Sequence, residues 1–196
     1  MSKKILLFLC KGFEAYEASV FTDVFGWNNY YGDGGVEVET VGFRKEVEAC
    51  WNFRIKPELL YESINIEDYD ALAIPGGFEE EGFYDDAFDE RFIQLIQAFH
   101  LQHKIIASVC VGAIPVGKSG ILKGKQATTY DLFDNHRRGQ LSGFGANVLD
   151  RDIVVENNII TSTGPATAID VALLLLEMFT SKENKDNVRH YMRFKN

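Results

Sequence analysis

The chain has 196 residues and a formal net charge of −9, so it is long enough to bury the core of one domain. Its acidic balance argues against a nucleic-acid partner or an anionic membrane surface, because both need a basic face on the protein. No stretch approaches the about 20 apolar residues of a membrane span, and no small-residue cleavage site follows the first apolar run. We therefore expect one domain over residues 1–196 in the cytoplasm.

Short apolar runs alternate with longer segments of helical period, which is the pattern of a parallel sheet covered by helices on both faces. Five parallel core strands are predicted at Ile5–Cys10, Val36–Gly42, Ala71–Ile74, Ile105–Val109 and Ile159–Ser162. Helices are predicted at Ala15–Tyr31, Ala87–Gln102, Val111–Gly120 and Ala166–Phe179. The sequence thus predicts an α/β fold.

Two further stretches interrupt this alternation. Val47–Ile55 and Gly143–Glu156 have the pattern of hairpins at a sheet edge. The charged tail, Ser181–Asn196, carries apolar residues at helical spacing and predicts a last helix, docked on the domain or on a second subunit.

The cysteines and histidines predict neither a disulfide nor a metal site. Cys10, Cys50 and Cys110 are widely spaced without a paired motif, so we expect reduced thiols. Among the four histidines only His100 and His103 are close in sequence, and no cluster of other ligands accompanies them. We expect no metal and no cofactor.

The strongest candidate for chemistry is Cys110, which follows a predicted strand directly and opens a helix. Ser108 and Gly112 provide small residues two positions before and after it, as a sharp strand-to-helix turn requires because the two backbones crowd together. The positive end of a helix dipole also favours the thiolate. The alternative is a small buried residue after a core strand.

Two other segments are expected at the same edge of the sheet, beyond the carboxyl ends of the strands. Gly76 and Gly77 follow the strand Ala71–Ile74 and present backbone N–H groups that could stabilise an oxyanion, although the turn can also be explained by its backbone angles. Glu17, near the start of the first helix, could hold or accept a proton. Alternatively, Glu14 and Glu17 only complement the helix dipole.

Together these segments resemble the ThiJ/PfpI family, which includes the parkinsonism-associated deglycase, PfpI-type intracellular proteases and isonitrile hydratases. The resemblance covers nearly the whole chain, and its carriers are Lys11-Gly12 with Glu17, Pro75-Gly76-Gly77, Ala107–Gly112, Gly120–Tyr130 and Thr161–Ala168. It implies a flavodoxin-like sheet sandwiched by helices, with Cys110 as nucleophile, Glu17 as its carboxyl partner, and Gly77 and Val111 as backbone donors.

The chain departs from the family pattern at two positions. Protease-type members have a histidine directly after the cysteine, where this chain has Val111, and deglycase-type members have a histidine where this chain has Tyr130. A phenol is a poor base at neutral pH but can donate a hydrogen bond to an oxyanion. His136 could substitute for the missing imidazole, or it could lie on a solvated face with Arg137 and Arg138.

Three functions remain open from the sequence. The first is an enzyme whose Cys110 attacks a small electrophilic substrate, as a hydratase or hydrolase or in a glyoxalase- or deglycase-like reaction. The second is a redox sensor or stress chaperone that uses an oxidisable Cys110. The third is an intracellular protease or amidase, which Val111 makes less favourable. Related proteins commonly form dimers, and the aromatic-rich segment Phe13–Tyr31 would suit a homodimer contact.

Overall fold

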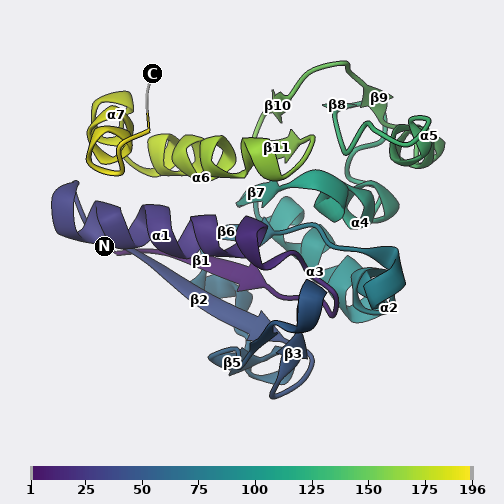
Figure 1. The fold of residues 1–196 in the computed structure, drawn as a ribbon, viewed down its shortest axis with the longest axis horizontal. Helices are drawn as coiled ribbons and strands as arrows, with labels where there is room; N and C mark the ends of the chain where they lie inside the picture. Colours follow the sequence, from purple (N-terminus) through teal and green to yellow (C-terminus); the bar gives the residue numbers. More distant parts are fainter. Residues whose placement is uncertain (1, 195–196) are drawn as a thin grey trace.

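The computed structural model describes residues 2–194 and contains a central seven-stranded sheet (Figure 1). The strand order is β10-β11-β7-β6-β1-β2-β5, and every neighbouring pair is parallel except β10 and β11. The strands are β1 (Lys3–Phe8), β2 (Val36–Gly42), β5 (Leu59–Leu60), β6 (Ala71–Ile74), β7 (Ile105–Ser108), β10 (Ile153–Glu156) and β11 (Ile159–Ser162). The predicted α/β, flavodoxin-like class is confirmed.

Helices cover both faces of this sheet, and Figure 1 shows α1 in front of it and α3 behind it. The first group of helices, which pack on one another, comprises α1 (Ala15–Tyr31), α6 (Pro165–Phe179) and α7 (Lys182–Tyr191). The second comprises α2 (Phe83–Ala87), α3 (Glu90–Leu101), α4 (Ala113–Lys118) and α5 (His136–Gly143). Since both faces are covered, consecutive residues such as Ile5, Leu6 and Leu7 are all buried.

Most predicted elements are present, with shifted ends. The strand predicted to reach Cys10 ends at Phe8, although the Leu9 N–H still donates a hydrogen bond to the Val41 carbonyl of β2 at 2.8 Å. The helix predicted over Ala87–Gln102 begins only at Glu90, because the Asp89 side chain accepts a hydrogen bond from the N–H of Arg91 and caps a new helix. The segment predicted as the helix Val111–Gly120 begins with a 3₁₀ turn and continues as α4.

Of the two predicted hairpins, one forms and one does not. In Val47–Ile55 the strands β3 (Val47–Glu48) and β4 (Arg54–Ile55) pair antiparallel, as a separate small sheet. The hairpin predicted within Gly143–Glu156 is wrong, because β9 (Asn147–Val148) pairs parallel with β8 (Gln126–Ala127). The chain instead reverses after β10, where Asn157 adopts a φ of 57° in a tight turn to β11.

The predicted tail helix is α7, and it docks on its own domain; residues 195–196 of that segment lie outside the described residues. Asn184 of α7 donates a hydrogen bond to Asn28 of α1 at 2.8 Å, and Tyr191 stacks on Tyr31. Tyr30 nearby is 86% exposed. The homodimer stays a prediction, which the mass in solution at micromolar concentration tests. No helix within residues 2–194 combines the length and apolar character needed to cross a membrane.

Candidate active site

Cys110 lies on a strained turn that its neighbours hold in place. After β7 the chain turns sharply, and Cys110 adopts a φ of 55°, in the left-handed region that a non-glycine residue enters at a cost. A Cβ on Gly112 would lie 2.6 Å from the carbonyl oxygen of Ile74, so only glycine permits this close approach of the two backbones. Thr129 Oγ1 donates a hydrogen bond to the Cys110 carbonyl at 2.9 Å. The predicted sharp turn is therefore present and braced.

The predicted carboxyl partner lies against this turn. Glu17, in the first turn of α1, is fully buried, and its Oε2 accepts a hydrogen bond from the Gly76 N–H at 2.7 Å. A Cβ on Gly76 would lie 2.8 Å from both Cys110 Cβ and Glu17 Oε2. The structure thus brings Cys110, Glu17 and Gly76 into one cluster.

The backbone donors do not all have the role expected from the sequence. Because the Gly76 N–H is bonded to Glu17, it leaves no free donor for an oxyanion, and Gly76 instead positions the carboxyl. The Gly77 N–H has no acceptor within residues 2–194, and the Val111 N–H interacts with the Cys110 sulfur. Gly77 and Val111 both line the cavity beside the thiol and remain the candidate donors.

Burial controls the protonation of Glu17. It raises the pKa of the carboxyl to about 8, and the negative charge of Glu14 adds to this, while the Gly76 N–H and the Cys110 thiol oppose it. Glu17 Oε1 has no hydrogen-bond partner among residues 2–194. At neutral pH Glu17 is therefore mainly a neutral acid.

The expectation of a lowered thiol pKa is wrong. Cys110 is 7% exposed, and burial raises the pKa of its thiol, with the charge of Glu17 as the next cause and the Val111 N–H in opposition. The helix that follows, α4, has only six residues and does not offset the loss of hydration. Cys110 and Glu17 consequently titrate as a coupled pair that retains its protons at neutral pH.

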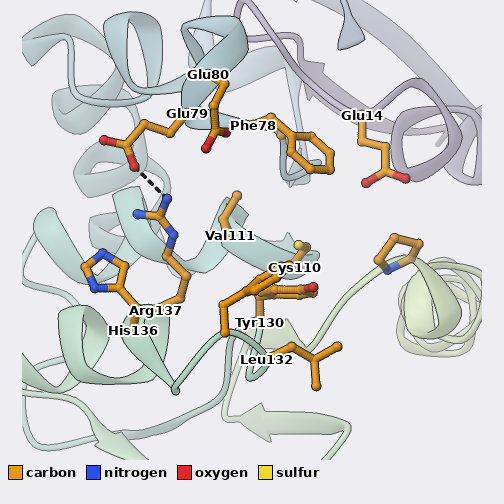
Figure 2. A pocket seen from close by; sticks show the side chains of 13 residues that line it. Glu14, Phe78, Glu79, Glu80, Cys110, Val111, Tyr130, Leu132, His136 and Arg137 are labelled. Atoms are coloured by element: carbon orange, nitrogen blue, oxygen red, sulfur yellow. Dashed lines mark hydrogen bonds and ion pairs between the residues drawn. The ribbon is translucent and has the colours of Figure 1, made fainter. Parts of the chain in front are cut away.

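A cavity of about 660 Å³ opens over Cys110, while Glu17 lies behind the thiol and does not line it. Figure 2 shows Tyr130 beside Cys110, and burial followed by the thiolate charge of Cys110 raises the pKa of the phenol. In the same view Arg137 lies between Cys110 and His136. Of the two auxiliary candidates, the structure brings Tyr130 to the thiol and leaves His136 at the far end of the cavity.

Sequence reasoning missed several cavity residues. Glu14, interpreted only as a helix-terminal charge, lines the cavity with 8% exposure. Arg137, expected on a solvated face, is mostly buried, forms an ion pair with Glu79 at 2.7 Å and lies over the ring of Tyr84. No sequence signal separates these residues from surface charges. In the described part of the chain no three His, Cys, Asp or Glu side chains gather as metal ligands.

The fold and this cluster define an α/β protein with a candidate cysteine site beyond the carboxyl ends of its parallel strands. The model of the DJ-1/PfpI family matches residues 3–178, and the chain belongs to this family. The resemblance seen in the sequence motifs is thereby confirmed.

Individual relatives agree with this assignment. An uncharacterized protein of Methanocaldococcus jannaschii is 30% identical over 132 residues, which are 67% of this chain and 62% of that protein, so the chain spans less than two thirds of this relative. Deglycase PfpI of Pyrococcus furiosus is 27% identical over 132 residues, 67% of this chain and 75% of the relative. The crystal structure of Drosophila melanogaster DJ-1beta has a TM-score of 0.87 at 24% identity, with both chains covered at 100%. This last likeness concerns the fold.

Proposed function

We propose that the protein is a cysteine-dependent enzyme that adds the Cys110 thiol to the carbonyl carbon of a small aldehyde or α-oxoaldehyde. The observation that carries this proposal is the pairing of Cys110 with a buried carboxyl, Glu17, whose pKa is about 8. A group with a pKa near the working pH both accepts and returns a proton efficiently. The relative named Deglycase PfpI supports a carbonyl substrate by analogy.

In the first step the sulfur forms a bond to the carbonyl carbon, and the π electron pair of the carbonyl moves to its oxygen. The ionised form of Glu17, a minority at neutral pH because the pKa of the carboxyl is about 8, takes the thiol proton and transfers it to that oxygen, which gives a hemithioacetal. The N–H groups of Gly77 and Val111 and the Tyr130 hydroxyl are the candidate donors to the developing oxyanion.

With an α-oxoaldehyde the reaction can continue without an oxidant. Glu17 removes the proton from the carbon bonded to sulfur, and a proton returns to the neighbouring carbon, so that the hemithioacetal becomes a thioester of a 2-hydroxy acid. Water then cleaves the thioester and restores the Cys110 thiol. The net change is the addition of one water molecule to the substrate.

The two alternatives have weaker support. Cysteines that are exposed and ionised are oxidised to sulfenic acid most readily. The Cys110 thiol is only 7% exposed, and its pKa is raised. Proteolysis would need a base next to the sulfur, and the residue after Cys110 is Val111 while His136 is distant in Figure 2. We therefore rank the redox sensor and the protease below the carbonyl reaction.

The test follows the conversion of methylglyoxal to lactate by the purified protein. We expect Cys110→Ala to lower turnover by at least about 10³-fold, because the nucleophile is removed. Cys10→Ala is the matched control, since Cys10 is equally a buried thiol after a core strand but does not line the cavity. Full turnover by Cys110→Ala would remove the proposal, and a single modification of Cys110 without turnover would favour the redox sensor.

A further inference from the structure

The wall of the cavity is acidic, and the Arg137 guanidinium that lines it already has hydrogen-bond partners. Among the described residues, Glu14, Glu79, Glu80 and Arg137 are the lining residues with charged carboxyl or guanidinium groups. Arg137 is bonded to Glu79 at 2.7 Å and to Gln140 at 3.0 Å. Glu14 and Glu80 have no ion pair within residues 2–194, so the field inside the cavity disfavours an anionic substrate.

Glu14 is the more informative of these two carboxyls. It is the N-cap residue of α1, only 8% of its surface is exposed, and its side chain is directed into the cavity in Figure 2. Its carboxyl makes no hydrogen bond or ion pair with any of residues 2–194, and burial raises its pKa. The carboxyl oxygens of Glu14 are not themselves fully enclosed by protein but face the cavity. A ligand that brings a positive charge beside Glu14 would pair with this carboxyl in a partly desolvated site, where the attraction between opposite charges is stronger than in water.

Aromatic rings accompany the unpaired carboxyls. In Figure 2 the Phe78 ring lies between Glu14 and Glu80, and Tyr130 and Leu132 face it across the cavity. The indole of Trp51 packs edge-on against Phe78, with the ring centroids 5.4 Å apart, and supports the Phe78 ring without lining the cavity itself. Aromatic faces next to carboxylates attract organic cations, because the negative ring face and the carboxylate charge act on the same group.

The cavity also has room for more than a three-carbon aldehyde. Its volume of about 660 Å³ lies within the range of pockets that hold a complete small-molecule ligand. The thiol occupies one part of the cavity, while Glu14, Glu80 and Phe78 line the wall above it in Figure 2. A substrate that fills both parts carries its reactive carbon and its recognition group a few bonds apart.

We infer that the substrate is an aldehyde that bears an ammonium or alkylammonium group, with the cation held between Glu14, Glu80 and Phe78 while the carbonyl carbon meets Cys110. The position of the carbonyl rests on the proposed function. The cation site does not, because it can be measured on a protein that performs no chemistry.

The binding experiment uses a pair of ligands that differ in charge but not in shape. Choline and its uncharged isostere 3,3-dimethylbutanol are titrated calorimetrically into the Cys110→Ala protein. We expect choline to bind at least about tenfold more tightly. In this background Glu80→Gln and Glu14→Gln should each reduce the preference several-fold. Glu81→Gln, the same change in the same 3₁₀ turn but outside the cavity, should leave it unchanged.

The kinetic experiment compares trimethylammonioacetaldehyde with 3,3-dimethylbutanal on the wild-type protein, and we expect a higher kcat/KM for the cationic aldehyde.

Equal binding of choline and its isostere would overturn the inference, as would a preference for choline that survives both Glu80→Gln and Glu14→Gln. Because Glu80 is exposed, its variant keeps the test valid even if Glu14→Gln fails to fold. A choline preference without turnover of any aldehyde would sustain the cation site and remove the proposed function.

Discussion

Two buried carboxyls near the carboxyl ends of β1 and β6 compensate for burial in opposite ways. Asp86 of α2 accepts a hydrogen bond from the Lys11 N–H at 2.7 Å and forms a two-pronged ion pair with Arg44. Glu17 has one backbone donor, Gly76, and no cation, and its pKa rises to about 8. The Arg44 guanidinium therefore compensates the buried negative charge of Asp86, whereas Glu17 avoids a buried charge by keeping its proton.

This difference separates a structural carboxyl from a chemical one. The Arg44 guanidinium cannot leave Asp86 without breaking contacts between the loop after β2 and α2, so that pair joins parts of the fold. A proton on Glu17 can leave and return without moving any backbone. The cavity lies over the thiol beside Glu17, and Asp86 does not line it.

The largest effect expected from this comparison is on catalysis. Glu17→Gln should lower kcat/KM for methylglyoxal by about 10³-fold, because a positioned acid–base group contributes roughly 10²- to 10⁴-fold and an amide cannot accept the thiol proton. Asp86→Asn, the corresponding change at the paired carboxyl, should alter it less than about tenfold. The measurement is steady-state kinetics at pH 7, and comparable losses in both variants would contradict the separation of roles.

A smaller effect is expected on the pH dependence of stability. Between about pH 4.5 and 8 the folded protein keeps the Glu17 proton that the unfolded chain has already lost, so the free energy of unfolding should fall as the pH rises through this window. Glu17→Gln cannot ionise and should avoid this loss, which amounts to a gain on the order of a few kcal/mol at pH 8 relative to the parent protein.

Urea unfolding at pH 5 and pH 8 measures this difference, and a Cys110→Ala background removes the coupled titration of the thiol. The stability advantage of Glu17→Gln should be small at pH 5 and should grow toward pH 8. An advantage that is equal at both pH values would show that Glu17 does not keep its proton in the folded protein.

The smallest effect concerns the ion pair. Asp86→Asn should destabilise the protein by about 2 kcal/mol, below the roughly 3 to 5 kcal/mol of a fully buried pair, because the Arg44 side chain is 45% exposed and water can solvate it. Denaturant unfolding at pH 7 gives the value. Lys3, which pairs with the half-buried Asp70, supplies a comparison, since Lys3→Met at that exposed pair should cost less than about 1 kcal/mol. A smaller loss for Asp86→Asn than for Lys3→Met would contradict the structural role of Asp86.

Much of the fold could be predicted because burial on both faces leaves a direct signal in the sequence. The core strands are continuous apolar runs, and the first helix has the predicted bounds, Ala15–Tyr31. The second predicted hairpin failed because local pattern does not determine partners: Asn147–Val148 finds β8, which is distant in sequence. Strand β5 escaped prediction since Leu59–Leu60 is a two-residue strand with no periodicity to recognise.

The candidate site was predictable only where backbone crowding fixes residue types. The small residues around Cys110 and the glycines after β6 indicate that two backbone segments approach each other closely, and the structure shows these close approaches. Protonation could not be predicted, because the pKa of a thiol depends on how much protein covers it. The cavity role of Glu14 was equally hidden, since a glutamate at a helix start is usually a solvated charge.

Glu14 is the N-cap of α1 and Glu17 lies three residues further along, in the first turn of the same helix. If Glu14 selects the substrate and Glu17 moves its proton, a small tilt of α1 alters selection and rate at the same time. Natural variation in the helix packing, for example where α7 buttresses α1 through Asn184 and Asn28, is then expected to change both properties together. In evolutionary terms, substrate range and turnover would be linked traits in this lineage.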